Sequence, residues 1–313
     1  MAEPLARALE LAERGRGTTH PNPVVGAVVV RDGAVVGEGW HERRGEAHAE
    51  VRALEASGER ARGATLYATL EPCDHHGATP PCTDAIVAAG VARVVAAARD
   101  PTPGRAGLER LREAGVEVEL VDSFEARRQN EAWRTWAAEG RPFVTYKVAA
   151  TLDGRTTLPG SRWISGDESR RLVHELRAQA DAVAVGMGTF RADRPRLTAR
   201  GVGAARQPRR IVFGRGPLPD DSGLELAAGP LDEELRRLAG EGVQSLLFEG
   251  GATLATAFLE RDLLDKLLVF VAPWLAGAGP HILGDLARPR ELQRLHARPI
   301  GADVLLEAYV HEP

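Results

Sequence analysis

The sequence predicts an α/β protein with two domains. Apolar, strand-like runs alternate with helical patterns along the chain, as expected when helices cover the faces of a sheet. The length of 313 residues is about twice the roughly 150 residues typical of one domain. A Gly-Arg-Pro sequence at 140–142 interrupts the alternation, so we expect domains at 1–141 and 142–313.

The first domain is expected to contain a hairpin and further helices and strands. Residues 1–7 read as the start of an amphipathic helix. Asp32 and Gly33 separate two apolar runs, and Gly accepts the positive φ that a two-residue hairpin turn needs. Helices are expected at 46–57, 83–89, 108–114 and 124–139, and strands at 27–30, 35–39, 65–70, 93–97 and 116–121.

The second domain repeats the alternation without repeating the first domain's sequence. Its expected strands are 143–150, 182–186, 210–213, 245–248 and 266–271, and its expected helices are 168–178, 232–240 and 254–260. The segment 200–230 is rich in Gly, Pro, Ala and Arg, so we expect surface loops around one strand there.

Composition narrows the class of ligand and the compartment. Every long apolar run is interrupted well short of a membrane span, so no membrane partner is expected. The net charge of −4 argues against a nucleic-acid partner and favours a small-molecule substrate. The first residues lack the basic-then-apolar order of a secretory signal, so we expect a cytoplasmic protein.

Four residues of the first domain predict a zinc site. His48, Cys73 and Cys82 offer three protein ligands, which leaves the fourth position of a tetrahedral zinc open for water. Zinc lowers the pKa of such a water toward neutrality, and Glu50 is close enough in sequence to move its proton. His-x-Glu followed by Pro-Cys is typical of zinc nucleobase deaminases. The alternative is a surface helix with two buried structural cysteines.

Three segments give the first domain a family resemblance: THPNPVVG at 19–26, GWHERRGEAHAE at 39–50 and TLEPC through TPPC at 69–82. They resemble the bifunctional riboflavin-biosynthesis deaminase/reductases, which implies a cytidine-deaminase-like α/β/α layered domain. The resemblance assigns zinc to His48, Cys73 and Cys82, proton transfer to Glu50, and pyrimidine binding to Asn22, His41 and His75. Asn22 alternatively serves as a turn residue before Pro23.

Two features of the second domain are chemically unusual. Lys147 lies inside an apolar strand and is one of only two lysines, so it is a site candidate unless its ammonium simply reaches solvent at a sheet edge. Glu249, Gly250 and Gly251 separate a strand from a helix. Bare glycines there let backbone N–H groups approach a phosphate, although an ordinary strand-to-helix turn has the same pattern.

The second domain resembles the reductase half of the same family, through the Lys147–Arg155 run, SRWIS at 161–165, DRP at 193–195 and FEGG at 248–251. The resemblance implies a dihydrofolate-reductase-like α/β fold. It assigns NADPH binding to Ala150, Trp163, Thr189, Asp193, Gly251, Ala252, Thr253, Leu254, Ala255, Thr256 and Ala257. It assigns a catalytic role to Lys147 and sugar-phosphate binding to Ser161, Arg177, Leu197, Arg200 and Glu249. Guanidinium groups suit phosphate oxygens as ligands.

The sequence departs from this family at three places. Ala78 stands where the family carries a basic residue, so one substrate contact is absent or comes from elsewhere. The segments 100–104 and 219–231 are shorter than is usual in the family. Because 219–231 is short, the preference for NADPH over NADH is expected from the family resemblance alone.

The expected function is that of a bifunctional enzyme with Zn²⁺ and NADPH as cofactors. It deaminates 2,5-diamino-6-(ribosylamino)-4(3H)-pyrimidinone 5′-phosphate and then reduces the ribosyl chain to give 5-amino-6-(5-phosphoribitylamino)uracil. The alternatives are a zinc deaminase of another nucleobase and a binding protein with a degenerate site. The family also leads us to expect a homo-oligomer, either a dimer or a tetramer.

Overall fold

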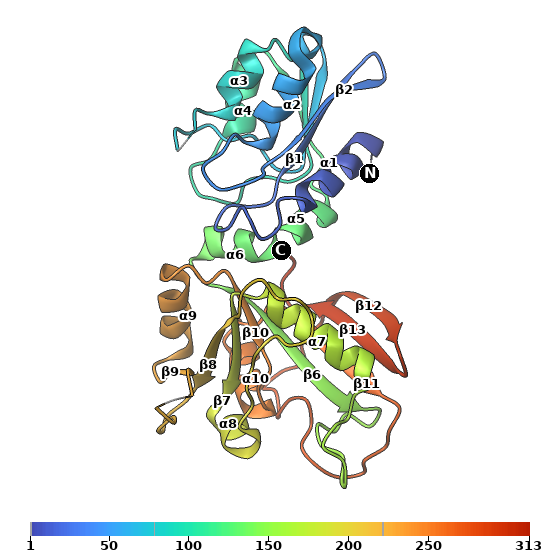
Figure 1. The fold of residues 1–313 in the computed structure, drawn as a ribbon, viewed down its shortest axis with the longest axis vertical. Helices are drawn as coiled ribbons and strands as arrows, with labels where there is room; N and C mark the ends of the chain where they lie inside the picture. The colour runs from blue at the N-terminus through green and yellow to red at the C-terminus, as the bar shows by residue number, and fades with distance from the viewer. Residues whose placement is uncertain (1, 78, 221) are drawn as a thin grey trace. The chain divides into compact units, whose positions relative to one another are not determined.

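The structure is a computed structural model that describes residues 2–77, 79–220 and 222–313, so the departure at Ala78 lies outside the described residues. The chain folds into two compact units (Figure 1). The first unit runs to Glu139 and also includes Pro313, and the second runs from Gly140 to Glu312.

A mixed five-stranded sheet forms the centre of the first unit, in the order β2-β1-β3-β4-β5. Its strands are β1 (Gly26–Arg31), β2 (Ala34–Trp40), β3 (Thr65–Ala68), β4 (Arg93–Ala96) and β5 (Glu117–Leu120). Strand β1 is antiparallel to β2 and β3, and β3, β4 and β5 are parallel. The predicted hairpin is confirmed, with φ of 51° at Asp32 and 78° at Gly33.

Helices cover both faces of this sheet because buried side chains alternate along β1. Ala8 and Leu11 of α1 (Glu3–Glu13) cluster with Val28 on one face. Ala49 and Ala53 of α2 (Ala49–Ser57) belong to the larger apolar cluster on the other face. The remaining helices are η1 (Gly58–Ala61), α3 (Cys82–Ala88), α4 (Gly107–Glu113), α5 (Phe124–Gln129) and α6 (Glu131–Glu139).

Two glycines of β2 bring α2 unusually close to the sheet. A Cβ atom at Gly39 would lie 2.5 Å from the carbonyl oxygen of Ala49, and one at Gly37 would lie 2.2 Å from that of Ala53. Such distances are clashes, so only glycine permits this packing. The close contact fixes the N-terminal end of α2, which carries His48 and Glu50.

The expectation of one helix over 124–139 is wrong because Asn130 interrupts it. The Asn130 side chain is buried and exchanges two 2.9 Å hydrogen bonds with the backbone N–H and C=O of Val24. Its backbone leaves the helical region, with φ of −118° and ψ of 25°. A tertiary contact therefore divides the segment into α5 and α6.

The second unit contains an eight-stranded sheet in the order β12-β13-β11-β6-β10-β7-β8-β9. The six strands from β11 to β9 in this order are parallel, whereas β13 is antiparallel to both of its neighbours. The strands are β6 (Phe143–Thr151), β7 (Ala182–Gly186), β8 (Arg209–Phe213), β9 (Glu225–Ala227), β10 (Ser245–Phe248), β11 (Lys266–Ala272), β12 (Gln293–Ile300) and β13 (Asp303–Tyr309).

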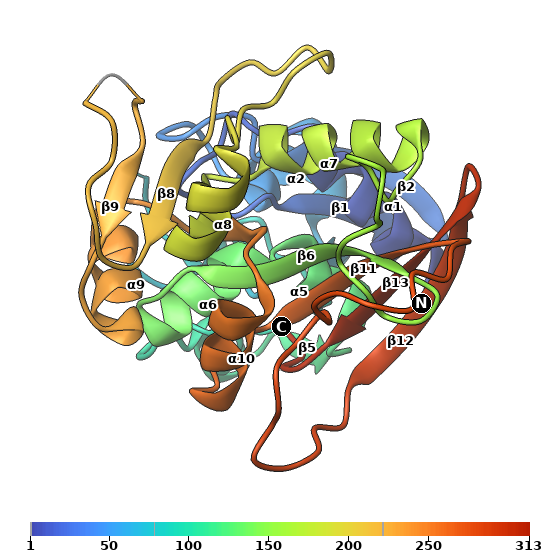
Figure 2. The ribbon, with the colours of Figure 1, turned by 90° about the horizontal axis from the view of Figure 1, so that it is seen from below.

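Two pairs of helices cover opposite faces of this sheet (Figure 2). On one face lie α7 (Asp167–Gln179) and α8 (Met187–Asp193), with apolar clusters that include Val173 and Phe190. On the other face lie α9 (Leu231–Gly240) and α10 (Ala252–Glu260), which contribute Leu235 and Phe258 to one core with the sheet. The parallel strands direct their carboxyl ends toward one edge, where ligands of open α/β sheets commonly bind.

Several elements of the second unit were not expected from the sequence. Strands β9, β12 and β13 and helix α8 are additions, and 200–230 contributes to two strands rather than one. The sequence did not predict strand β12 because this strand lies at the sheet edge and nearly all of its residues are exposed. Such a strand lacks the alternation of apolar and polar residues that marks a half-buried strand. Strand β9 and helix α8 are short, and short elements carry little periodicity.

Candidate active sites

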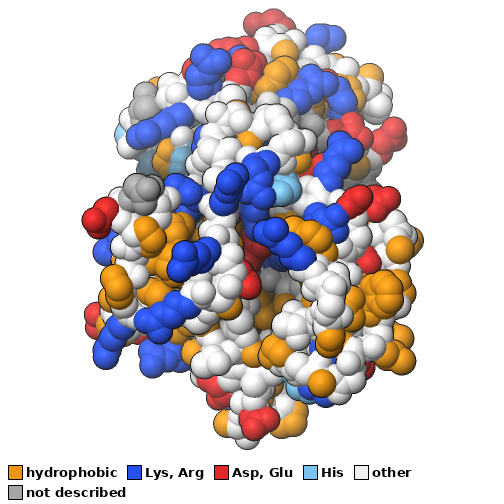
Figure 3. Space-filling view, turned by 60° about the horizontal axis from the view of Figure 1, so that its bottom comes forward, with side chains coloured by type: hydrophobic (Ala, Val, Ile, Leu, Met, Phe, Trp, Pro, Cys, Tyr) orange, Lys and Arg blue, Asp and Glu red, His pale blue; other side chains and the backbone are white. Residues whose placement is uncertain are grey.

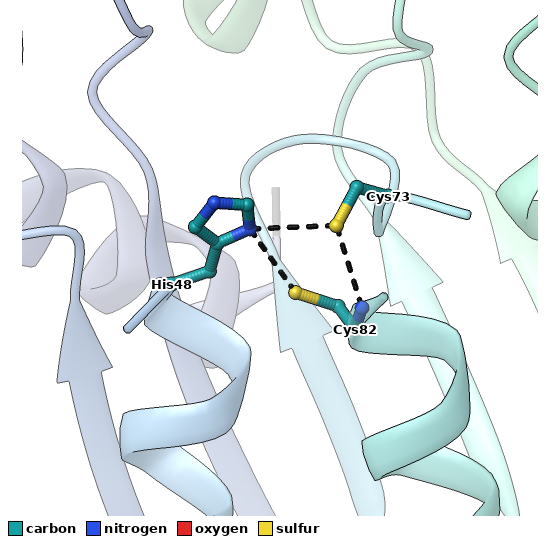
Figure 4. A group of neighbouring side chains, drawn as sticks. All are labelled: His48, Cys73 and Cys82. Atoms are coloured by element: carbon teal, nitrogen blue, oxygen red, sulfur yellow. Dashed lines mark hydrogen bonds between the residues drawn. The ribbon is translucent and has the colours of Figure 1, made fainter. Parts of the chain in front are cut away.

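Three separate elements bring His48, Cys73 and Cys82 together (Figure 4). His48 is the N-cap residue of α2, and Cys82 is the first residue of α3. Cys73 lies in the loop that follows β3. Each side chain points toward the same small space at the carboxyl end of β3 (Figure 4).

The spacing of the three ligand atoms fits a tetrahedral zinc ion. The Nδ1 atom of His48 lies 3.4 Å from Sγ of Cys73 and 3.3 Å from Sγ of Cys82. All three atoms lie within 4.8 Å of one another. Zinc bonds of about 2.0–2.3 Å at tetrahedral angles require nitrogen-to-sulfur separations of about 3.6 Å. The geometry therefore leaves room for zinc with one open coordination position.

The two thiols shift each other's pKa in opposite directions, so the Cys82 thiol keeps its proton more readily than the Cys73 thiol. Hydrogen bonds from Cys82 lower the pKa of Cys73 to about 4 against the opposing effect of burial, and His48 contributes to this lowering. The same shared hydrogen bond, together with burial, raises the pKa of Cys82 far above its ordinary value. A divalent cation would replace that proton and stabilise both thiolates, so the chemistry of the donor set also fits zinc.

Glu50 lies in the first turn of α2, directly beside the three ligand atoms. Its side chain is buried, with 3% of the residue exposed. Burial raises the pKa of Glu50 to about 7, although nearby His48 opposes the shift. A carboxyl group of this kind can both accept and donate a proton near neutral pH.

A cleft of about 600 Å³ opens over these residues and is also lined by the predicted pyrimidine-binding residues Asn22, His41 and His75. The Asn22 amide lies 3.2 Å from Nε2 of His41, and Nδ1 of His41 lies 3.3 Å from the carbonyl oxygen of Ala47. Within the described part of the chain, Nδ1 of His75 is buried and has no hydrogen-bond partner. The cleft therefore presents polar groups on more than one side of the predicted metal position.

The sequence patterns missed several residues that line this cleft, namely Arg44, Glu71, Arg105, Trp133 and Trp136. The two tryptophans lie three positions apart on α6, and that spacing puts them on one helical face. The arginines carried no sequence signal, because the chain contains many arginines and the cleft is formed by segments far apart in sequence.

In the second unit, Lys147, Arg177 and Glu249 form a buried ion cluster. Arg177 donates to both carboxylate oxygens of Glu249, with its Nε atom 2.6 Å from Oε1 and its Nη2 atom 2.9 Å from Oε2. The Nζ atom of Lys147 lies 3.6 Å from Oε2. These side chains come from β6, from α7 and from the residue that follows β10. The interpretation of Lys147 as merely reaching solvent is wrong, because its ammonium faces this carboxylate.

Within the cluster, the ion pairs oppose the effect that burial has on the pKa values of Lys147 and Glu249. Burial lowers the pKa of Lys147, while Glu249 partly opposes this shift. Burial alone would raise the pKa of Glu249, but Lys147 and Arg177 hold it below its ordinary value. Glu249 is therefore a stable anion between two cations.

A short segment after α8 presents Arg200 near this cluster. The backbone N–H of Arg200 lies 3.3 Å from Nδ1 of His174, and Arg177 donates a 3.2 Å hydrogen bond to the carbonyl oxygen of Thr198. Leu197 is buried with a φ of 55°, an unfavourable conformation that the surrounding contacts hold in place. His174 and Arg177 lie one turn apart on α7, and sequence reasoning missed His174.

The strand-to-helix turn of Gly251 lies next to Thr189, as the predicted cofactor set requires. A Cβ atom at Gly251 would lie 3.2 Å from the Thr189 hydroxyl. Ala252, Thr253, Leu254 and Ala257 occupy the first turns of α10. Ala255, by contrast, is fully buried in the core, and Thr256 accepts a 2.8 Å hydrogen bond from the backbone of Gly284.

The other predicted residues of the second unit make no hydrogen bond or ion pair to the ion cluster among the described residues. Ser161 and Trp163 lie in an exposed loop and hydrogen-bond to each other. Asp193 is exposed at the end of α8, and Ala150 is buried near the end of β6. On the face drawn in Figure 3, basic side chains gather around a hollow in which acidic atoms are visible.

Two family models match this chain, one in each of its two units. The model of the cytidine and deoxycytidylate deaminase zinc-binding region matches residues 2–98, and that of the RibD C-terminal domain matches residues 142–306. The riboflavin biosynthesis protein RibD of Escherichia coli is 40% identical, covering 96% of this chain and 97% of the relative. The chain belongs to the RibD family. RibD of Aquifex aeolicus is 43% identical over 89% of the chain and 88% of its own length.

Solved RibD structures match both units together. Acinetobacter baumannii RibD superposes with a TM-score of 0.85 at 36% identity, covering 98% of this chain and 97% of that structure. A deaminase/reductase from Thermotoga maritima gives a TM-score of 0.82 at 35% identity, with 98% and 97% covered. The expected two-domain α/β fold is confirmed: the first unit matches the cytidine and deoxycytidylate deaminase zinc-binding region, and the second matches the RibD C-terminal domain.

No helix among the described residues combines the length and apolar character needed to cross a membrane.

Proposed function

We propose that this RibD-family chain carries out two successive reactions of riboflavin biosynthesis, a deamination in residues 1–141 and a reduction in residues 142–313. The observation that carries the proposal is the convergence of His48, Cys73 and Cys82 with Glu50 in one cleft. The family matches on both halves of the chain add the second activity.

In the first unit, His48, Cys73 and Cys82 would hold zinc, which when bound would make a water molecule nucleophilic near neutral pH. Glu50 would take a proton from the attacking water and deliver it to the departing amino group, which leaves as ammonia. Asn22, His41 and His75 hold the pyrimidine ring so that the carbon bearing the amino group faces the water. The product of this step carries an oxygen in place of the 2-amino group of 2,5-diamino-6-(ribosylamino)-4(3H)-pyrimidinone 5′-phosphate.

In the second unit, Lys147 and Glu249 orient the ribosyl chain, and Ser161, Leu197, Arg177 and Arg200 hold the sugar phosphate. The Gly251 turn and the first turns of α10, together with Thr189, Asp193, Trp163 and Ala150, would hold NADPH. When bound, NADPH supplies the hydride that reduces C1′ of the ribosyl group.

Mass spectrometry of the diaminopyrimidine ribosyl phosphate after incubation with the purified protein tests this proposal. Without NADPH we expect deamination alone, and with NADPH we expect deamination followed by reduction to 5-amino-6-(5-phosphoribitylamino)uracil. An unchanged substrate in both incubations would contradict the proposed function.

We also propose that the chain forms a homo-oligomer, either a dimer or a tetramer, through the second unit. The edge strand β12 is exposed, and exposed apolar side chains line one groove beside it, with Leu295 at 67% and Leu152 at 70% exposure. Exposed apolar patches and open sheet edges are typical of protein interfaces. Light scattering measures the molar mass of the wild type and of Leu295→Asp. We expect an oligomeric wild type and a variant of lower mass, and a monomeric wild type would contradict the proposed homo-oligomer.

We place the enzyme in the cytoplasm, because its two cysteines are free thiols that a reducing compartment preserves. Fractionation of the producing cell, with detection of the chain in each fraction, tests this placement.

A further inference from the structure

The cleft of the first unit contains a loop that is fastened to the metal-binding segment. This loop, residues 100–106, leads into the first residue of α4, Gly107, and carries Arg105. The buried carboxylate of Glu71 accepts a 3.1 Å hydrogen bond from the backbone of Asp100 and a 2.9 Å hydrogen bond from that of Leu108. Glu71, which lies two positions before Cys73, therefore fixes both ends of the loop.

Packing fixes the loop further. A Cβ atom at Gly107 would lie 1.8 Å from the carbonyl oxygen of Pro72, so the loop backbone rests directly on the metal-binding segment. Inside the loop, the Asp100 side chain accepts from the N–H of Thr102, and the N–H of Arg105 donates to the carbonyl oxygen of Thr102. The position of Arg105 is thus set by the fold before any ligand binds.

The charge of Arg105 is not neutralised by the surrounding protein. Within the described residues, the Arg105 guanidinium has neither an ion pair nor a hydrogen bond, although the side chain is partly buried and lines the cleft. Three acidic groups of the cleft have other partners: Glu46 pairs with Arg52 at 2.8 Å, Asp100 accepts from the N–H of Thr102, and Glu71 accepts from backbone N–H groups. The fourth, Glu50, lies at the predicted metal position. A cation in this setting is available to an anionic ligand.

The other segments of the cleft offer little competition for an anion. The sequence from Cys73 to Cys82 contains no Lys or Arg. Among the described lining residues, the guanidinium groups are those of Arg105 and Arg44. Arg44 is solvent-exposed and, in the described part of the chain, also has no side-chain partner.

We propose that Arg105, assisted by Arg44, binds the phosphate group of the substrate in the deaminase cleft. This inference rests on the proposed function and assigns a specificity-determining residue to it. A guanidinium fork matches two phosphate oxygens and forms charge-assisted hydrogen bonds. Arg105 contributes more than Arg44 because its side chain is partly buried and its loop is fixed, whereas water screens an exposed charge.

Deamination kinetics in the absence of NADPH test the inference with two substrates, the ribosyl phosphate and its dephosphorylated nucleoside. For Arg105→Ala we expect KM for the phosphorylated substrate to rise roughly 10- to 100-fold, with the kinetics on the nucleoside and the zinc content unchanged. Arg105→Lys keeps the charge and recovers part of the loss. Arg44→Ala shows the same selectivity with a smaller effect.

Two exposed arginines serve as matched controls. Arg110→Ala on α4 and Arg43→Ala beside Arg44 remove a guanidinium that does not line the cleft, so both substrates keep their wild-type kinetics. An equal change of Arg105→Ala on both substrates, or no change on either, would overturn the assignment while leaving the deaminase function intact.

A binding measurement separates this inference from the proposed function. Calorimetric titration with ribose 5-phosphate uses the Arg200→Ala protein, in which the expected phosphate site of the second unit is weakened. We expect binding by this protein and its loss in the Arg105→Ala/Arg200→Ala protein. If the wild type deaminates neither substrate, the proposed function fails, but this titration still decides whether Arg105 binds a sugar phosphate. Equal binding by both proteins would overturn the inference.

Discussion

The two units treat buried charge in different ways. In the first, Cys73, Cys82 and His48 converge within 4.8 Å, and the two thiols shift each other's pKa in opposite directions. In the second, Glu249 lies between Arg177 at 2.6 Å and Lys147 at 3.6 Å, so the protein itself neutralises the carboxylate.

This difference indicates what each site needs in order to be complete. The thiolate pair of the first unit requires a cation that the protein does not supply, whereas the anion of the second unit is already paired. The first site should therefore depend on bound metal, and the second should keep its geometry without a ligand.

Zinc removal should have the largest and most selective effect. Dialysis against a chelator is expected to abolish deamination and to lower the melting temperature of the first unit, since metal binding stabilises the folded ligand set. Reduction of predeaminated substrate should continue at the untreated rate. Product analysis and scanning calorimetry measure both effects, and added zinc should restore deamination. A parallel loss of reduction would contradict the independence of the two sites.

Glu50→Gln tests proton transfer without disturbing the ligand set. We expect deamination to fall by about 10²–10⁴-fold, because the amide keeps the shape of the side chain but cannot accept the proton. Bound zinc, measured by elemental analysis, and the rate of reduction should stay at wild-type values. Residual deamination close to the wild-type rate would remove Glu50 from the proposed reaction.

Lys147→Met should affect the second unit alone. The methionine fills a similar volume in β6 but removes the ammonium beside Glu249, so we expect reduction to fall roughly 10²-fold. Deamination provides the internal control and should not change. A wild-type rate of reduction would assign Lys147 a structural role only.

Glu249→Gln should produce a smaller, pH-dependent loss of stability. The neighbouring cations hold the folded pKa of Glu249 below its ordinary value of 4.5, so its stabilisation is present above pH 4.5. It disappears as the pH falls through the lowered folded pKa. At pH 7 the variant leaves two buried cations unpaired, which costs about 3 kcal/mol or more.

Calorimetric melting of wild type and Glu249→Gln across pH 3–7 measures this dependence. The difference in melting temperature should be largest near neutrality and should shrink below pH 4.5. A difference that is constant over this range would show that the carboxylate charge does not contribute to stability.

The sequence predicted much of the fold where a local pattern has one dominant interpretation. The predictions of the hairpin at Asp32-Gly33 and of most strands and helices were correct. Periodic burial in a strand or helix produces an apolar pattern among neighbouring residues, and that pattern can be recognised in the sequence. The break at Asn130 was missed because a buried side chain hydrogen-bonds to Val24, more than a hundred positions away. The edge strand β12 was missed because it has no buried face.

The sequence by itself determined the chemistry of the first site, since His48, Glu50, Cys73 and Cys82 carry a spacing that few structures other than a metal site explain. Tertiary structure alone decided which charges meet. Neither the ion cluster of Lys147, Arg177 and Glu249 nor the fixed position of Arg105 has a local signature, because the contacting residues come from separate strands, helices and loops. Coulomb interactions depend on distance in space, and only the packed sheets set that distance.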